Sequence, residues 1–262
     1  MEQKKQGAIA VIDSGVGGIS VLRELLRFMP GERYIYLADS KNAPYGTKSR
    51  DEVLKITLEN TNRLLSLGAK AIVVACNTAT SAAVRVMREK YPDVPIVGIE
   101  PAVKPAVSAF ERPTVAVMAT PLTLVEEKFR SLSERFGGMA EIIPLPCPGL
   151  MEIIEEGHTD GEVVDAYLKN AFAHLGEKKS DAVVLGCTHY PFVKVAVQRY
   201  FGDRTLVFDG GEGTAREARR RIIEAGLETD NVSDTPEIKF ISTNGDDSVT
   251  ELCRKLLDIE NY

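Results

Sequence analysis

The sequence lacks several features that define whole classes of protein. Its 262 residues include no tryptophan, three histidines and four cysteines, and none of the cysteines forms a Cys-x-x-Cys pair. No hydrophobic run approaches the roughly 18 residues of a membrane-spanning helix, and residues 1–7 are polar with no secretory core behind them. These absences argue against a disulfide-stapled secreted domain. We expect a water-soluble cytoplasmic protein with reduced thiols that does not bind a membrane.

Positive charge is also in short supply. The chain has 32 lysines and arginines against 38 aspartates and glutamates, a formal net charge of -6 and a pI near 5.3, with no dense basic cluster. Such a balance opposes binding to a phosphate backbone, so nucleic acid is not an expected partner. Hydrophobic residues make up 44% of the chain, which is enough for a core. The length suits one large domain or two domains of roughly 100 to 150 residues.

What the sequence does contain is an alternation of short β-branched runs with helical patterns. The runs predict nine strands, at Ala8–Asp13, Tyr34–Ala38, Ala71–Ala75, Ile96–Ile99, Thr114–Met118, Glu141–Leu145, Ala182–Gly186, Thr205–Phe208 and Ile238–Ser242. The alternation predicts a doubly wound α/β fold. Capping boxes predict helix starts at Ser49-x-x-Glu52, Thr159-x-x-Glu162 and Ser248-x-x-Glu251. Helix stops are predicted at Gly31, Gly68, Gly137, Gly176 and Gly226.

Two of the predicted strands lead directly to a cysteine. Cys76 follows Ala71–Ala75 and Cys187 follows Ala182–Gly186, and a helix-compatible stretch comes after each cysteine. Ligands of parallel α/β folds bind at the carboxyl ends of the strands, so both thiols are expected at a binding edge. The repeated layout suggests two similar α/β halves that meet near Gly98–Lys104, with a cleft between them and one thiol from each half.

Two further loops lie at predicted carboxyl ends of strands. The glycine-rich segment 13–18 leads into a helix whose amides would face an anion, or it is a tight turn that needs positive φ angles. It also suggests dinucleotide binding with Asp39 as the ribose-binding acid. That reading is weaker, because Ser20 replaces the third glycine and Asp13 would lie beside the pyrophosphate. The polar segment 37–46 is either a surface turn or a substrate lip.

The paired thiols admit several chemistries. Zinc would need four ligands, and only His189 lies beside these cysteines at usable spacing, so we expect no metal site. A disulfide is disfavoured by a reducing compartment. A nucleophilic thiol with a base would leave the second cysteine unused. Proton transfer with one base on each face of a flat intermediate uses both. Cys147 and Cys253 are expected to be structural.

Four ordered motifs give the chain a specific resemblance. Asp-Ser-Gly-x-Gly-Gly at 13–18, Ala-Asp-x-x-x-x-Pro-Tyr-Gly at 38–46, Ala-Cys-Asn-Thr-Ala-Thr at 75–80 and Gly-Cys-Thr-His-Tyr-Pro at 186–191 together resemble the glutamate racemases of the aspartate/glutamate racemase family. The resemblance implies cofactor-independent interconversion of L- and D-glutamate, which supplies the D-isomer for peptidoglycan. It also implies a homodimer of chains with two pseudo-symmetric α/β domains, residues 1–98 with 209–262 and residues 99–208.

The same resemblance implies roles for individual residues. Cys76 and Cys187 are the acid/base pair, assisted by Asp13 and His189 respectively. The substrate-binding positions are Asp13, Ser14, Pro44, Tyr45, Gly46, Asn77, Thr78, Thr188 and His189. The family's further acidic residue falls at Glu155 or at its neighbour Glu156, and we favour Glu155.

A free thiol is a weak base for an α-proton beside a carboxylate, so the carbanion itself must be stabilised. With no cofactor implied, we expect the amides of the two cysteine turns to hold the α-carboxylate. Racemisation of aspartate or another amino acid, a nucleotide-binding oxidoreductase and a non-catalytic ligand-binding protein remain alternatives.

Overall fold

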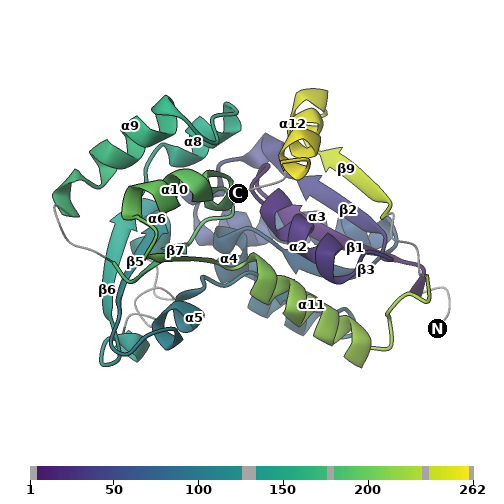
Figure 1. The fold of residues 1–262 in the computed structure, drawn as a ribbon. Coiled ribbons are helices and arrows are strands. Elements are labelled where there is room, and N and C mark those ends of the chain that lie inside the picture. The colour runs from purple at the N-terminus through teal and green to yellow at the C-terminus, as the bar shows by residue number, and fades with distance from the viewer. Residues whose placement is uncertain (1–4, 126–133, 176–179, 232–235, 260–262) are drawn as a thin grey trace. The chain divides into compact units, whose positions relative to one another are not determined.

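The computed structural model describes residues 5–125, 134–175, 180–231 and 236–259. The chain forms two compact units, Met1–Glu100 with Gly211–Asp258, and Pro101–Gly210 with the last residues of the chain. Each unit is built on its own parallel sheet (Figure 1). Across the described ranges, none of the helices combines the length and the apolarity that crossing a membrane requires.

The first sheet contains five parallel strands in the order β4-β3-β1-β2-β9. Their bounds are Ala8–Asp13 for β1, Tyr34–Ala38 for β2, Ala69–Val74 for β3, Ile96–Gly98 for β4 and Ile238–Ser242 for β9. Every residue of β2 is buried, and so are the last five residues of β1 and of β3. Continuous burial of this kind explains why these strands are apolar throughout rather than alternating.

Helices cover both faces of this sheet. They are α2 (Ile19–Phe28), α3 (Arg50–Ser66), α4 (Asn77–Lys90), α11 (Gly211–Glu224) and α12 (Asp247–Leu257), with the short turns η1 (Ser40–Asn42) and η2 (Tyr45–Thr47). Helices α3 and α4 pack together over a core that includes Ala10 and Ile12 of β1. Helix α2 packs with α11 and α12 on the other face (Figure 1).

The second sheet contains four parallel strands in the order β6-β5-β7-β8. Their bounds are Thr114–Ala119 for β5, Glu141–Pro146 for β6, Ala182–Leu185 for β7 and Leu206–Asp209 for β8. The helices are α5 (Val103–Ser108), α6 (Pro121–Val125), α8 (Leu150–Glu155), α9 (Glu162–Ala171) and α10 (Lys194–Phe201), with the turns η3 (Ala173–Leu175) and η4 (Tyr190–Val193). Helix α5 packs on β5 and β7, and α10 packs on α9.

The two sheets share a strand order. The run β4-β3-β1-β2 of the first unit corresponds to β8-β7-β5-β6 of the second, and β9 is an addition to the first. In each unit the chain reverses its direction of travel after the first two strands, so β1/β3 and β5/β7 are topological switch points, where open α/β sheets bind ligands. The predicted class, two doubly wound α/β domains, is confirmed.

Two predicted helix starts are wrong. The capping box of Ser49 and Glu52 is present on α3. Helix α9 instead begins at Glu162 after Gly161, whose φ of 86° is incompatible with a helical turn starting at Thr159. Helix α12 is capped by Asp246, which accepts from the Ser248 amide, so Ser248 lies inside the first turn. Asp246, two residues before Ser248, is therefore the N-cap residue of α12.

Some of the predicted helix stops match observed helix ends and others do not. Gly68 and Gly226 follow α3 and α11 with positive φ angles, as left-handed helix ends require. Gly137 directly follows a helical residue, whereas Gly31 lies beyond the actual C-cap of α2, Met29. Gly176 lies outside the described residues.

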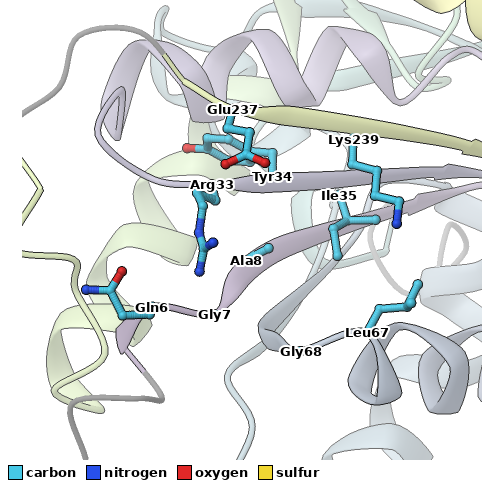
Figure 2. Close-up of a pocket in the computed structure, with 10 residues that line it drawn as sticks. All are labelled: Gln6, Gly7, Ala8, Arg33, Tyr34, Ile35, Leu67, Gly68, Glu237 and Lys239. Carbon is cyan, nitrogen blue, oxygen red and sulfur yellow. The ribbon is translucent and has the colours of Figure 1, made fainter.

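The amino ends of the first sheet border an open hollow of about 340 Å³. Figure 2 shows its lining, in which Arg33, Glu237 and Lys239 surround the starts of β1, β2 and β9. The hollow is at the opposite end of these strands from Asp13 and Cys76. It is therefore not part of the binding edge that the sequence predicts.

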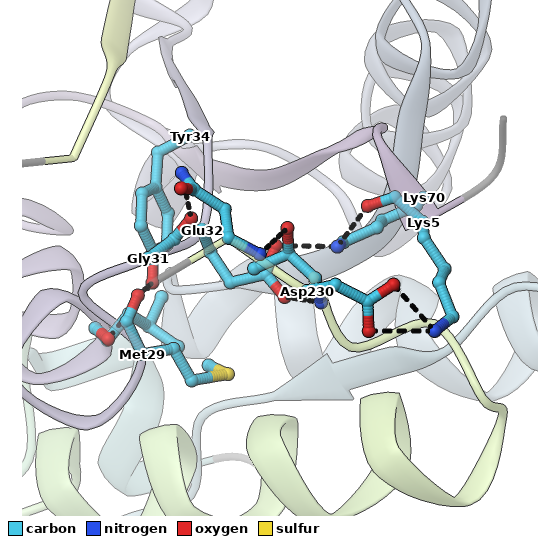
Figure 3. A network of polar contacts seen from close by, with 10 residues as sticks. Lys5, Met29, Gly31, Glu32, Tyr34, Lys70 and Asp230 are labelled. Atoms are coloured by element: carbon cyan, nitrogen blue, oxygen red, sulfur yellow. Dashed lines mark hydrogen bonds and ion pairs between the residues drawn. The ribbon is translucent and has the colours of Figure 1, made fainter. Parts of the chain in front are cut away.

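A buried ion pair fastens the same end of the sheet. Lys70 Nζ lies 2.5 Å from Glu32 Oε2, with side chains 2% and 3% exposed (Figure 3). Lys70 also donates to the carbonyl of Lys5, and Glu32 accepts from the amide of Thr229. Burial lowers the pKa of Lys70, which the attraction to Glu32 opposes. The pair joins segments that are far apart in the sequence.

Candidate active site

The first group of predicted residues gathers at the carboxyl edge of the first sheet. Asp13 is the last residue of β1, and Cys76 lies two residues beyond β3, the neighbouring strand. Both residues therefore lie at the β1/β3 switch point. A Cβ atom added to Gly18 would lie 2.8 Å from Asp13 Cβ and 2.9 Å from Ala75 Cβ, so α2 begins in close contact with both strand ends.

The glycine-rich loop requires glycine because its backbone approaches other residues closely, not because it adopts positive φ angles. Gly18 has a φ of -63°, and positive φ angles occur at none of the glycines in this loop. The expectation that the turn needs positive φ is therefore wrong, because the requirement is room for the strand ends. Asp13 is fully buried and its Oδ1 accepts from the Gly15 amide at 2.8 Å. The loop thereby folds around this carboxylate, with Ser14 also buried.

Cys76 is the N-cap residue of α4. Its backbone is extended (φ -76°, ψ 124°), its carbonyl accepts from the Thr80 amide, and its side chain is 7% exposed. Asn77 and Thr78 occupy the first turn and are half-buried. Their amides therefore lie at the positive end of the α4 dipole, a favourable place for a carboxylate or a thiolate.

The polar segment after β2 is anchored by a buried carboxylate. Asp39 is fully buried, and its oxygens accept from the side chains of four residues, Asn42, Tyr45, Asn60 and Thr243. These four partners are neutral donors. With both oxygens engaged in this way, Asp39 is not available to bind a ribose, which removes the main support for the dinucleotide hypothesis.

Tyr45 faces inward from this segment. Its hydroxyl donates to Asp39 Oδ2 at 2.5 Å and its side chain is 1% exposed. Burial first and Asp39 second raise the pKa of Tyr45, with Cys76 and Asp13 acting in the same direction, so the phenol stays protonated. Tyr45 therefore anchors the lip by its side chain. Pro44 is exposed and Gly46 half-buried on either side of it, after a cis Ala43-Pro44 peptide bond.

The second group gathers at the carboxyl edge of the second sheet. Cys187 lies two residues beyond β7, as Cys76 does beyond β3, and it is half-buried. The preceding Gly186 donates to the carbonyl of Met118 on β5 at 2.7 Å. A Cβ atom on Gly186 would lie 2.7 Å from that same oxygen, so only glycine fits this approach. The thiol is thus fixed beside the β5/β7 switch point.

His189 connects Cys187 to a carboxylate. Its Nδ1 lies 3.8 Å from Cys187 Sγ, and its Nε2 lies 3.0 Å from Glu155 Oε1. The imidazole is 2% exposed and the Glu155 side chain 37% exposed. A ring nitrogen that donates to a carboxylate leaves the other nitrogen able to exchange a proton with the thiol. Glu155 ends α8 and makes this contact, whereas Glu156 is the C-cap residue.

The sequence did not predict two further residues, Thr120 and Thr243, near these edges. Thr120 follows β5, the strand beside β7, and its hydroxyl lies 2.9 Å from that of Thr123. Thr188, which was predicted, is buried next to Cys187. Position after a strand that neighbours the cysteine strand was the available signal for Thr120. The anchoring of the lip by Asp39 and Thr243 depends on contacts between distant segments and had no such signal.

The remaining cysteines, which the sequence predicts to be structural, are both buried. Cys147 is 2% exposed, and its thiol donates to the carbonyl of Leu145. Burial, reinforced by nearby Cys187, raises the pKa of Cys147 to about 12. Cys253 is fully buried on α12. No group of three or more His, Cys, Asp or Glu side chains suitable for a metal ion occurs in the part of the chain that the structure describes.

Comparison with known proteins identifies the class of protein to which this fold and the two cysteine-bearing sheet edges belong. The family model for Asp/Glu/hydantoin racemases matches residues 9–218. The chain belongs to that family, and it is accordingly an isomerase.

Among individual relatives, the glutamate racemase of Clostridium perfringens (strain SM101) is 45% identical over 256 residues, covering 98% of both chains. The structure of a glutamate racemase isoform from Bacillus anthracis has a TM-score of 0.86 at 28% identity and covers 98% of this chain and 96% of its own. The Escherichia coli glutamate racemase, in complex with L-glutamate and the activator UDP-MurNAc-ala, has a TM-score of 0.82 at 30% identity and covers 95% of each chain.

Proposed function

We propose that this enzyme interconverts L- and D-glutamate without a cofactor, using the thiols of Cys76 and Cys187 as two bases. The observation that supports this most is the repeated placement of a thiol two residues beyond the third strand of each sheet in chain order, β3 or β7, at a topological switch point. The substrate assignment rests on relatives that are named glutamate racemases and that match this chain over nearly their full length.

In this mechanism each thiol acts on its own face of the α-carbon. One cysteine must be a thiolate that removes the α-proton while the other is a thiol that supplies one to the opposite face, and the roles exchange in the reverse direction. Asp13 would assist Cys76, and His189, oriented by Glu155, would assist Cys187.

The difficult step is formation of the carbanion. An α-proton beside a carboxylate is far less acidic than a thiol, so the developing enediolate must be stabilised by fixed donors. The first-turn amides of α4, at Asn77 and Thr78, lie next to Cys76 and suit the α-carboxylate. The turn of Thr188 and His189 would serve Cys187 in the same way. Removing one such donor typically costs a factor of about 100 or more in turnover.

Selection of glutamate is assigned to residues 44–46, the last part of the lip formed by segment 37–46. Its side-chain anchor, Tyr45, points into the core, so the backbone N–H groups of Tyr45 and Gly46 remain to donate to the substrate's side-chain carboxylate, beside the ring of Pro44. Ser14, on the adjacent loop, would add a hydroxyl. We further propose that the product serves peptidoglycan synthesis in the cytoplasm and that the enzyme is a homodimer, on the strength of the family resemblance.

A polarimetric assay of the purified protein with L-glutamate and no added cofactor tests the proposal. Optical rotation should decay to zero with glutamate and change far more slowly with aspartate and other L-amino acids. Faster decay with aspartate would reassign the substrate. Tight glutamate binding without any change of rotation would contradict an enzymatic role.

Substitution of each thiol tests the mechanism. Cys76→Ser and Cys187→Ser should each lower kcat for racemisation at least about 100-fold, because each removes one of the two acid/base groups. In heavy water, the thiol that remains should still exchange the α-hydrogen of one glutamate enantiomer, and the two variants should favour opposite enantiomers. Negligible loss from both substitutions would refute the assignment.

A further inference from the structure

The turn that follows the last strand of the first sheet makes close contacts with the substrate lip. Thr243 comes directly after β9, and its amide donates to the carbonyl of Ala38 at the end of β2. Its hydroxyl donates to Asp39 Oδ1 at 2.6 Å and accepts from the Lys41 amide at 3.1 Å. One side chain, more than 200 residues away in sequence, therefore holds both the lip's carboxylate anchor and its first turn.

A second contact runs beside the first. Ser242 Oγ lies 2.7 Å from Ser40 Oγ and donates to Asn244 Oδ1. Because a hydroxyl has a single proton, Ser40 must then be the donor to Ser242. The segment 242–244 thus contacts η1 through two hydroxyl groups, independently of the sheet hydrogen bonds between β9 and β2.

Asp39 transmits these contacts to the lip. Its Oδ2 accepts from Tyr45 at 2.5 Å and from Asn60 at 2.9 Å, and its Oδ1 accepts from Thr243 and Asn42. A fully buried carboxylate is costly unless its lone pairs are satisfied, so loss of one donor would displace the group toward another. Tyr45, whose side chain is held there, would move with it.

We propose that Thr243 is a positioning residue for substrate binding, which acts through Asp39 and Tyr45 on the peptide groups of the lip. The proposal rests on the function proposed above, in which residues 44–46 bind the side-chain carboxylate of glutamate. Thr243 does not touch the reacting atoms. Its loss should therefore weaken substrate binding while leaving proton transfer at the thiols intact.

Thr243→Val removes the hydroxyl and keeps the shape of the side chain. We expect KM for glutamate to rise about five- to twenty-fold, because one hydrogen bond to a charged group is lost, while kcat changes less than about two-fold. Thr243→Ser restores a hydroxyl and should recover most of the affinity. The matched control is Thr57→Val, a buried threonine whose hydroxyl donates to Val53 in its own helix. This control should leave KM unchanged.

Thermal midpoints of all variants separate positioning from folding. An unchanged KM in Thr243→Val, a fall in kcat alone, or an equal rise of KM in Thr57→Val would overturn the proposal. If Thr243→Val does not fold, Ser242→Ala, which removes the contact to Ser40 and the bond to Asn244 but keeps the Thr243 hydroxyl, should raise KM in the same direction by a smaller factor, and no rise there overturns it. Wild-type enzyme that fails to racemise glutamate would instead refute the proposed function.

Discussion

At the scale of the residue, the two thiols have different neighbours although their strands are equivalent. Asp13 reaches the Cys76 edge directly from the end of β1, whereas Cys187 is joined to Glu155 through His189. The position on β5 that corresponds to Asp13 is Ala119, so the second unit obtains its carboxylate from a helix. The sequence placed both thiols after strands, and the resemblance implied Asp13 and His189 beside them. Nothing in the sequence alone distinguished Glu155, which we favoured, from Glu156, because adjacent residues at one helix end differ only in the direction they face.

Glu155→Gln tests the orientation of His189. The amide still fills the site but loses the charge that stabilises a protonated imidazole, so kcat should fall about ten-fold, as for loss of groups that orient a reacting histidine. Steady-state rates in both directions measure it. The matched control is the neighbouring Glu156→Gln, which should stay within about two-fold of the parent enzyme. Equal effects from the two substitutions would contradict a specific role for Glu155.

Alkylation with iodoacetamide at pH 8 tests the ranking of the cysteines. Cys187 is half-buried and should react fastest. Cys147, with a pKa raised to about 12, stays a thiol at the assay pH and should remain unmodified. Mass spectrometry of tryptic peptides over time gives the order. Saturating glutamate should protect Cys187. Faster labelling of Cys147 than of Cys187 would show that its burial is not maintained in solution.

At the scale of the element, glycines decide how closely neighbouring segments approach the strand ends. Gly18 and Gly186 are needed because a Cβ atom would collide with the strand neighbours, and neither has a positive φ. Sequence patterns suggest turn angles but not close packing, which explains why the first glycine loop was misread. The helix starts at Thr159 and Ser248 failed for a similar reason, since competing caps and glycine angles depend on local geometry.

A pair of glycine substitutions in the first unit separates these effects. Gly18→Ala should lower the free energy of unfolding by about 1–3 kcal/mol, because the new methyl group meets Asp13 and Ala75. Gly213→Ala, inside α11 with open space around its Cβ position, should raise it by about 0.5–1 kcal/mol. Urea titrations followed by circular dichroism measure both. Stabilisation by Gly18→Ala would disprove the close contact.

At the scale of the whole molecule, the sequence predicts the class of fold well. Nine predicted runs correspond to nine strands in the described residues, with boundaries that differ by at most two residues. The central strands are apolar along their length because they are buried on both faces, as β2 and β7 are. The order of the strands was not predictable, since nothing local specifies that β9 pairs with β2. The buried pair of Lys70 and Glu32 escaped for the same reason.

Lys70→Met tests whether that pair supports the first unit. Removing the cation leaves Glu32 buried without its partner and should cost about 3–5 kcal/mol of unfolding free energy. The matched control is Lys5→Met at the ion pair with Asp230, whose side chains are 31% and 78% exposed, and it should cost less than about 1 kcal/mol. Adding Glu32→Gln to Lys70→Met should recover part of the loss. Similar costs for the two lysine substitutions would contradict the burial of the pair.

The most direct test of the two-base mechanism is the fate of the α-hydrogen during the first conversions of L-glutamate in heavy water. Proton magnetic resonance and mass spectrometry of the separated enantiomers would follow it. The account predicts that newly formed D-glutamate contains deuterium at the α-carbon, while the L-glutamate that remains is still protiated. D-glutamate that keeps the original hydrogen would mean that a single group moves the proton between faces, and it would contradict the roles given to Cys76 and Cys187.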